Sequence, residues 1–147
     1  MQDGFLVIDA QGRHAFVGGT PRVVAWLAGS PLLLADRQGV RPLRGLAEGD
    51  SPTWPRDRIM VIGGVRLSVH AASRAADGRI VATLGKRMVS ASPKMFRVFH
   101  RVAAMADHDA PVLILGESGT GKELIARSIH GLGRAAAHPC VAVNMAA

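Results

Sequence analysis

The sequence predicts two units of different fold class, an α+β unit over residues 1–88 and the start of an α/β unit over residues 89–147. In the first unit, short apolar runs alternate with turns that contain glycine, a pattern typical of antiparallel strands. In the second unit, an apolar run, a glycine-rich loop, a helix-forming run and another apolar run follow one another. This order is typical of a strand–helix–strand unit in a parallel sheet.

The composition indicates a folded, soluble protein. Hydrophobic residues make up 48% of the chain and charged residues 20%. The formal charge of +7 divides into +5 for residues 1–90 and +2 for residues 91–147, so the basic residues form no dense block, and there is no tyrosine for base stacking. A nucleic-acid-binding face is therefore not predicted. The single cysteine excludes an internal disulfide framework, and no apolar run reaches the ~18 residues of a membrane span, so we expect a cytoplasmic protein.

The first unit is predicted to open with a hairpin, in which strands at residues 5–8 and 14–17 flank a polar turn at residues 9–13. Thr20 and Pro21 are typical of a helix start. That helix would present an apolar face made of Val23, Val24, Trp26 and Leu27.

The remainder of the first unit is predicted to be loops followed by a second pair of strands. The run at residues 32–34 is too short to assign, and residues 35–58 are rich in Gly, Pro, Arg and Asp, which indicates loops. Strands are predicted at residues 58–71, with a bend at Gly63-Gly64, and at residues 79–84. The Asp77-Gly78 pair between them is typical of a hairpin turn.

Residues 4–86 resemble a PAS sensory domain, on the Asp-x-x-Gly-Arg turn at residues 9–13 and the Asp-Gly-Arg-Ile run at residues 77–80. The resemblance implies a sensory module with an unidentified ligand. A forkhead-associated-like or purely structural β-rich module is the alternative. Phe16, Trp26 and Trp54 would line a ligand pocket in the first case, although an aromatic side chain in a small domain is more often part of the core.

The second unit is predicted to begin with a connector at residues 86–91 and a helix that starts at Ser92-Pro93, an N-cap followed by proline at the first helical position. The apolar stripe of this helix recurs every three or four residues and comprises Met95, Phe96, Val98, Phe99, Val102 and Met105.

Two strands buried on both faces are predicted next, at residues 111–115 and 140–143. A right-handed crossover helix would join them over residues 122–130, with Gly131 as its C-cap. Its apolar side carries Leu124, Ile125 and Ile129. Cys140 would then be an inert thiol in the core.

The loop between the first of these strands and the helix reads Gly116, Glu117, Ser118, Gly119, Thr120, Gly121, Lys122 and Glu123. Glycines let backbone N–H groups turn toward an anion, a lysine adds positive charge, and a helix N-terminus follows, so the pattern predicts a nucleotide phosphate-binding loop. The generic pattern has Ser or Thr after the lysine to hold Mg²⁺. Glu123 stands there instead and must approach the metal through water or serve another role. A tight turn without a ligand is the alternative.

Residues 116–130 and 139–147 resemble the start of the AAA+ domain of sigma-54-dependent transcriptional activators, and residues 92–95 and 109–114 fit it too. In that family a glutamate follows the lysine. The resemblance implies that residues 116–122 cradle the phosphates of ATP, with Lys122 on the β and γ groups and Glu123 near Mg²⁺. Asn144 matches an asparagine thought to sense the γ-phosphate and restrain the catalytic glutamate; without the resemblance it would be a polar cap at a strand end. Cys140 and Met145 stand where the family usually has Phe and Cys.

For the whole protein, the resemblance implies a homo-oligomeric ring, a hexamer, that couples ATP hydrolysis to activation of sigma-54 RNA polymerase. Contacts with the polymerase and with promoter or enhancer DNA would lie in segments that are not among these residues. The 147 residues also contain no Walker B pair, sensor or arginine finger, so we expect a truncated site that binds phosphates without hydrolysing ATP. The alternative is a stand-alone, non-catalytic signal- or nucleotide-binding module. An unrelated P-loop kinase is disfavoured by Glu123.

The histidines predict no metal site, because none of them shows metal-ligand spacing and each is expected to be solvated or part of the core. They are His14, His70, His100, His108, His130 and His138. The sequence also contains no Gly-x-Ser-x-Gly and no catalytic-triad pattern.

Overall fold

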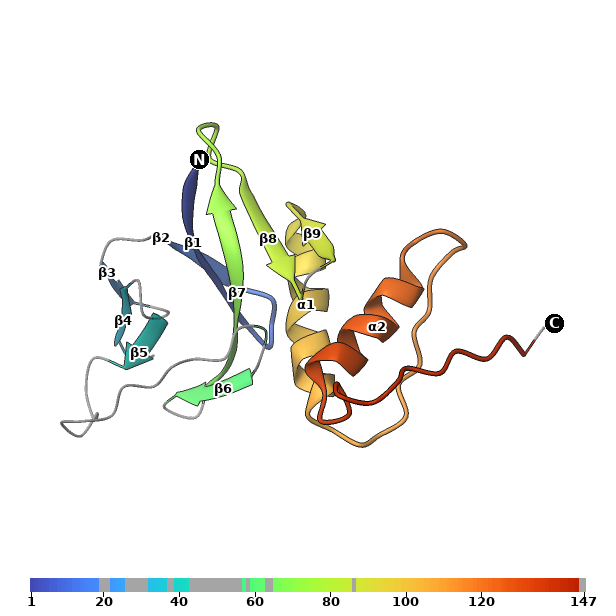
Figure 1. Ribbon diagram of the computed structural model, residues 1–147. Coiled ribbons are helices and arrows are strands. Elements are labelled where there is room, and N and C mark those ends of the chain that lie inside the picture. The colour runs from blue at the N-terminus through green and yellow to red at the C-terminus, as the bar shows by residue number, and fades with distance from the viewer. Residues whose placement is uncertain are drawn as a thin grey trace.

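The computed structural model describes residues 1–18, 22–25, 32–36, 39–42, 57, 59–62, 65–85 and 87–145. These residues form two antiparallel sheets and two helices (Figure 1). The strands are β1 Gln2–Asp9, β2 His14–Gly18, β3 Arg22–Ala25, β4 Leu32–Asp36, β5 Gly39–Pro42, β6 Ile59–Ile62, β7 Val65–Arg74, β8 Ile80–Leu84 and β9 Met88–Ser90, and the helices are α1 Pro93–Ala106 and α2 Lys122–Leu132.

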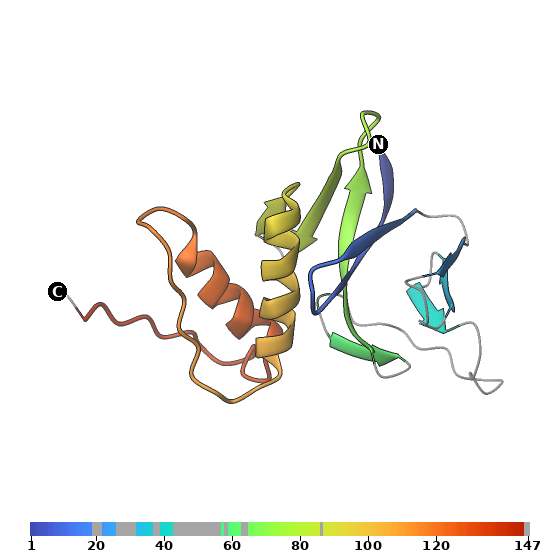
Figure 2. The same ribbon diagram turned by 180° about the vertical axis from the view of Figure 1, so that it is seen from behind.

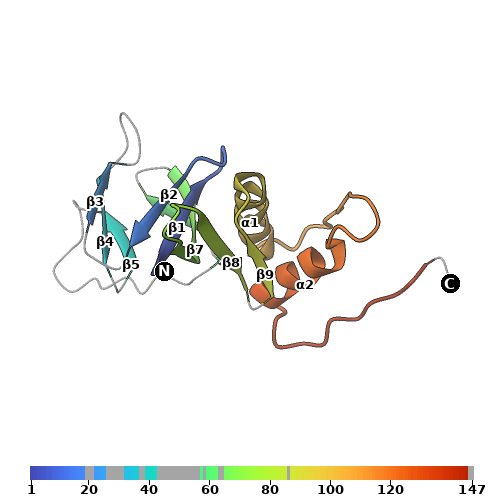
Figure 3. The ribbon, with the colours of Figure 1, turned by 90° about the horizontal axis from the view of Figure 1, so that it is seen from above.

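The elements are arranged as successive layers. Seen from above, the small sheet lies on one side of the large sheet, α1 lies on the other side, and α2 lies beyond α1 (Figure 3). The large sheet has the strand order β2-β1-β7-β8-β9, with β6 also paired to β7. The reverse view shows an extended segment that follows the turns after α2 (Figure 2).

The predicted first hairpin is confirmed, since β1 and β2 pair antiparallel with Phe5 opposite Val17 and Ile8 opposite His14. Asp9 fixes the turn. Its Oδ1 accepts hydrogen bonds from the backbone N–H groups of Gln11 (3.0 Å) and Arg13 (2.9 Å), and its Oδ2 accepts one from Arg13 Nε at 2.6 Å. Because this carboxylate is fully buried, the three bonds replace the water it has lost.

Strand β7 is the centre of the large sheet. It pairs with β1 along one edge, while β6 and β8 share its other edge, so the predicted hairpin that leads into residues 79–84 is confirmed. The single bent strand predicted over residues 58–71 is corrected, because this stretch forms two strands, β6 and β7, that pair antiparallel with each other. The predicted turn before β8 is also confirmed: Gly78 has a φ of 84°, and Asp77 Oδ1 accepts a 3.0 Å bond from the backbone N–H of Arg79. That bond lowers the pKa of the Asp77 carboxyl. Gly63 and Gly64 lie outside the described residues.

The small sheet corrects the prediction of a helix after Thr20. Residues Arg22–Ala25 form β3, which pairs with β4 through Val23 opposite Leu34 and Val24 opposite Leu33, and β5 completes the sheet. Two adjacent β-branched residues favour a strand when a partner is present, and here β4 supplies one. Thr20, Pro21, Trp26, Leu27 and Trp54 lie outside the described residues, as does most of the stretch predicted to be loops.

The connector predicted at residues 86–91 contains a short strand. Strand β9 pairs with β8, with Thr83 opposite Val89 and Leu84 opposite Met88. Met88 is buried and Val89 is exposed, so the alternation of a half-buried strand continues here up to the start of α1.

Helix α1 begins after Ser92 with a proline in its first turn, as predicted. The predicted stripe faces the large sheet: Phe96, Phe99 and Val102 are buried, and Met95 and Val98 pack partly buried against the same cluster. The remaining members of this cluster are Leu6, Ile8, Ala72, Ala82, Leu84 and Met88. The large sheet and α1 therefore share one hydrophobic core, with members on both sides of residue 88, the predicted boundary between the two units. Phe16 also packs against this core.

Helix α2 lies against α1 and is only partly buried. Ile125, Ile129 and Leu132 pack against the core cluster, but α2 has no buried residue. The helix continues past the predicted C-cap, since Gly131 lies within its last turn and Gly133 is the C-cap. The extra residues place Leu132 against the core, which explains the extension. Within the described part of the chain, neither helix is long and apolar enough to cross a membrane.

Candidate phosphate-binding loop

The loop that precedes α2 has the backbone of an anion-binding turn. Gly119 and Gly121 have φ values of 78° and 89°, in the left-handed region that side chains other than glycine rarely adopt. Gly121 is also the N-cap of α2. Left-handed residues beside a helix start turn successive N–H groups toward one point, which is the arrangement that holds phosphate oxygens.

The side chain of Lys122 folds back onto this loop. Its Nζ donates hydrogen bonds to the carbonyl oxygens of Gly116, at 2.8 Å, and Glu117. Thr120 Oγ1 also donates to the Glu117 carbonyl, at 2.8 Å. The ammonium group is thus held at the loop by the loop's own backbone.

The first glycine of the loop lies against two side chains of the same loop. A Cβ at Gly116 would lie 2.8 Å from Thr120 Oγ1 and 3.7 Å from Lys122 Cγ. A side chain at this position would push aside the Thr120 hydroxyl, which donates to the Glu117 carbonyl. The glycine spacing, the lysine and the helix start, which were recognised in the sequence, come together here in one compact turn.

Glu123 points to a neighbour on its own helix. Its Oε1 accepts bonds from Arg127 Nε (2.9 Å) and Nη2 (2.7 Å), an i,i+4 ion pair, and its side chain is 73% exposed. This hydrogen bond raises the pKa of Arg127, with the charge of Glu123 as a further cause. The prediction that Glu123 lies near a metal ion stays a prediction. Ser118 is exposed in a turn of the loop.

The two strands predicted to flank the loop and helix are not formed in the described structure. Residues 111–115 and 140–143 are extended but unpaired, and Leu113 and Val141 are each 82% exposed. The prediction was wrong because an apolar run becomes a strand of a parallel sheet only when neighbouring strands satisfy its backbone and cover its faces. Among the described residues, α2 packs on α1 and no strand lies beside either segment.

Two site residues on the second of these segments are correspondingly exposed. Asn144 lies in the extended stretch after residue 139, and Cys140, predicted to be a buried core thiol, is exposed. The exposure of Cys140 corrects that prediction, and the cause is the same: without a sheet, no second face covers the residue.

A cavity of about 570 Å³ lies between the end of the large sheet and α2. The sheet side contributes Asp57, Gly85 and Arg87. The other side consists of α2 residues and Cys140, namely Leu124, Arg127, Ser128, His130, Gly131 and Leu132. Nothing in the sequence pattern indicated this cavity, because its two walls are about 40 residues apart.

A buried polar cluster was also missed by the sequence. Asp57, Ser68, His70 and His100, which we call the buried relay, are hydrogen-bonded in a line beneath α1. Asp57, His70 and Ser68 follow the order of an acid–base–nucleophile triad, but Ser68 is fully buried and cannot meet a substrate. The described residues contain no cluster of His, Cys, Asp or Glu suited to a metal ion.

Comparison with known proteins identifies the segment that carries the loop. Residues 88–147 match the family described as the sigma-54 interaction domain. The same part of the chain is homologous to transcriptional regulators of the NtrC and ZraR type. No solved structure gives a significant match.

Three relatives illustrate the extent of the similarity. The DNA-binding transcriptional regulator NtrC of Bradyrhizobium sp. (strain RP501 Parasponia) is 50% identical over 60 residues, which are 41% of this chain and 12% of that protein. The transcriptional regulatory protein ZraR of Escherichia coli (strain K12) is 41% identical over 78 residues, 53% of this chain and 18% of that protein. The nitric oxide reductase transcription regulator NorR2 of Cupriavidus necator is 42% identical over 64 residues, 44% of this chain and 12% of that protein. The match thus spans less than a fifth of each relative's length.

Proposed function

We propose that residues 116–123 bind the phosphates of Mg²⁺-ATP, and that the chain is the ATP-binding part of a sigma-54-dependent transcriptional regulator. The observation that carries the proposal is the conformation of the loop: left-handed glycines open α2, and Lys122 is held over the turn. This loop lies inside the segment that matches the sigma-54 interaction domain.

The residues present fit a nucleotide's phosphates. Bound Mg²⁺-ATP would supply the anionic phosphates and the phosphoanhydride bond. The backbone N–H groups at Gly119 and Gly121 would donate to the phosphate oxygens, and Lys122 Nζ would exchange its two carbonyl acceptors for phosphate oxygens of higher charge. Such an exchange is favourable because an ionised acceptor makes a stronger hydrogen bond than a neutral carbonyl.

Glu123 would act near the metal only after its ion pair with Arg127 loosens, since one carboxylate oxygen already accepts both bonds from that side chain. The other oxygen, Oε2, is the group we assign to a metal-bound water. Asn144 would sense the γ-phosphate once its segment lies against the loop. These two roles rest on the resemblance to sigma-54-dependent activators.

For the intact regulator, we propose a homo-oligomeric ring that couples ATP hydrolysis to activation of sigma-54 RNA polymerase, in the cytoplasm. The groups that cleave ATP and contact the polymerase and DNA would come from other segments. Residues 1–88 would be the signal-responsive module. Their PAS-like assignment stays a prediction, and apart from Asp57 the described residues between β2 and β6 form strands rather than the short helices or loops expected there.

The test is calorimetric titration of the chain with Mg²⁺-ATP, comparing wild type with Lys122→Ala. The substitution removes the positive charge from the loop, and a charge-assisted bond contributes about 1.5–3 kcal/mol, so affinity should fall about 10- to 150-fold. Lys94→Ala is the matched control, because Lys94 is an exposed lysine in the first turn of α1, far along the chain from the loop. Equal affinity of the wild type and Lys122→Ala would rule out the phosphate-loop assignment.

A further inference from the structure

The buried relay occupies positions where the sheet should be apolar. Along β7, Leu67 and Val69 point to one face and Ser68 and His70 to the other, and this second face is the one covered by α1. Ser68 and His70 are fully buried there, and His100 reaches them from α1 while remaining only 4% exposed. A fold that places two histidines and a serine in its core must satisfy each of their polar atoms.

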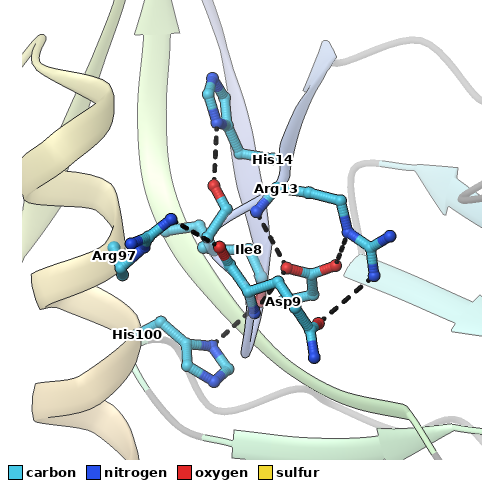
Figure 4. A network of polar contacts seen from close by, with 8 residues as sticks. Ile8, Asp9, Arg13, His14, Arg97 and His100 are labelled. Atoms are coloured by element: carbon cyan, nitrogen blue, oxygen red, sulfur yellow. Dashed lines mark hydrogen bonds and ion pairs between the residues drawn. The ribbon is translucent and has the colours of Figure 1, made fainter.

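The acceptors at the two ends of the relay determine where its protons lie. His100 Nδ1 is 3.1 Å from the carbonyl oxygen of Ile8, the contact drawn in Figure 4, and a carbonyl oxygen only accepts, so Nδ1 carries a proton. At the other end, His70 Nδ1 is 2.6 Å from Asp57 Oδ1, so this Nδ1 carries a proton as well. The second Asp57 oxygen accepts from the backbone N–H of Gly85 at 3.0 Å.

With both histidines neutral, the hydrogen bonds of the relay can all form when they run in one direction, from His100 through Ser68 to His70. The Ser68 hydroxyl donates to His70 Nε2 over 2.9 Å, and Ser68 Oγ accepts from His100 Nδ1 over 3.0 Å. Each buried donor then has an acceptor. His100 shares its Nδ1 proton between Ser68 and Ile8, which ties α1 to both β7 and β1.

One additional proton breaks this order. A proton on His70 Nε2 turns that nitrogen into a donor toward Ser68, and the Ser68 hydroxyl proton loses its acceptor. The only nitrogen left to receive it is His100 Nδ1, whose own proton would have to leave the Ile8 carbonyl. A proton on His100 Nε2 instead places a charge in the core beside a second histidine.

The charged groups around His100 do not offset its burial. The pKa of His100 is lowered, and burial is the largest cause. The bond to the Ile8 carbonyl and the charge of Asp9 raise this pKa, whereas His70 and Arg66 lower it further. Asp9 is itself paired with Arg13 at 2.6 Å. Asp57 faces His70 from the loop before β6 and lines the cavity, so the relay has one end from which solvent can deliver a proton.

We propose that the buried relay is a proton-sensitive latch, which holds α1 on the sheet while its hydrogen bonds keep this order and loosens α1 when an additional proton breaks the order. A second polar tie near this site, from Arg97 Nη2 to the Gln11 carbonyl at 2.9 Å, is exposed and does not involve the relay (Figure 4). Acidification should therefore act on α1 through the relay.

Urea unfolding of the chain between pH 5 and pH 8 tests the latch. Because the pKa of His100 is lowered in the folded protein, the unfolded chain binds this proton at a higher pH than the folded chain does. The contribution of neutral His100 to stability is therefore fully present above pH 6.5 and is lost as the pH falls toward the folded-state pKa. One such proton changes the unfolding equilibrium up to tenfold per pH unit. We expect this slope in the wild type and in His108→Gln, an exposed histidine two residues past α1, and a clearly smaller slope in His100→Gln. An equal slope in His100→Gln would overturn the proposal.

A second measurement does not depend on the variants folding. Histidine ring NMR of the wild type gives the titration of His100, and amide hydrogen exchange gives the protection of α1 relative to β8 at each pH. We expect protection of α1 to be lost with the same midpoint as the titration of His100. Titration of His100 without any change in α1 protection would overturn the proposal.

Discussion

Replacing Phe99 by alanine should remove a large part of the stability that joins α1 to the sheet. Phe99 is fully buried in the core cluster, and its ring lies 5.8 Å from that of His70 between centroids. A buried phenylalanine removes about 150–250 Å² from water, worth about 4–6 kcal/mol at ~25 cal/mol per Å², and measured Phe→Ala losses are about 3–5 kcal/mol. Since a small domain has only ~5–15 kcal/mol in total, this loss is severe.

The assay is urea unfolding followed by circular dichroism. With a slope of ~1–3 kcal/mol per M, the midpoint for Phe99→Ala should fall by at least about 1 M. Val89→Ala is the control, because Val89 is 65% exposed on β9 and its truncation should change stability by no more than about 0.5 kcal/mol. If Phe99→Ala and Val89→Ala unfold at the same urea concentration, α1 does not share the core of the large sheet.

Two further substitutions test the turn of the first hairpin and the loop before α2. Asp9→Ala should lower the stability by about 2–3 kcal/mol, because it removes a buried carboxylate with two backbone bonds and one bond to Arg13. The control Asp3→Ala, at an exposed position, should be nearly neutral. Equal midpoints of the two variants in thermal unfolding would contradict this role of Asp9. Gly121→Ala should lower the stability by about 1–2 kcal/mol and weaken ATP binding, because Gly121 has a left-handed backbone conformation. The control Gly131→Ala, at a helical position with open space around it, should be neutral or stabilising by about 0.5–1 kcal/mol. If the Gly121→Ala protein is as stable as Gly131→Ala, the loop does not need this conformation.

The features predicted correctly from the sequence are those fixed by local chemistry. Asp9 and Gly12, and likewise Asp77 and Gly78, specify their turns through bonds within a few residues, so both hairpins could be recognised without knowledge of the rest of the chain. The loop before α2 is local in the same sense, since its glycines and lysine are consecutive in the sequence.

The features that the sequence did not reveal depend on distant partners. Ser68 and His70 are polar residues on a strand, which normally indicates a solvent-facing side; their burial follows from His100, about 30 residues away, and from Asp57. The strand at Arg22–Ala25 depends on β4, and competing helix-start signals preceded it. Residues 111–115 show the converse, since an apolar run predicts a strand whether or not neighbouring strands are present.

The most direct test of the proposed phosphate-binding function is an amide NMR titration of the ¹⁵N-labelled chain with Mg²⁺-ATP and, separately, with Mg²⁺ and adenosine at the same concentrations. If residues 116–123 grip phosphates, ATP should shift the amide signals of Gly119, Gly121 and Lys122, while adenosine leaves them unchanged. Equal shifts with adenosine, or no shift of these signals at millimolar ATP, would contradict the proposal.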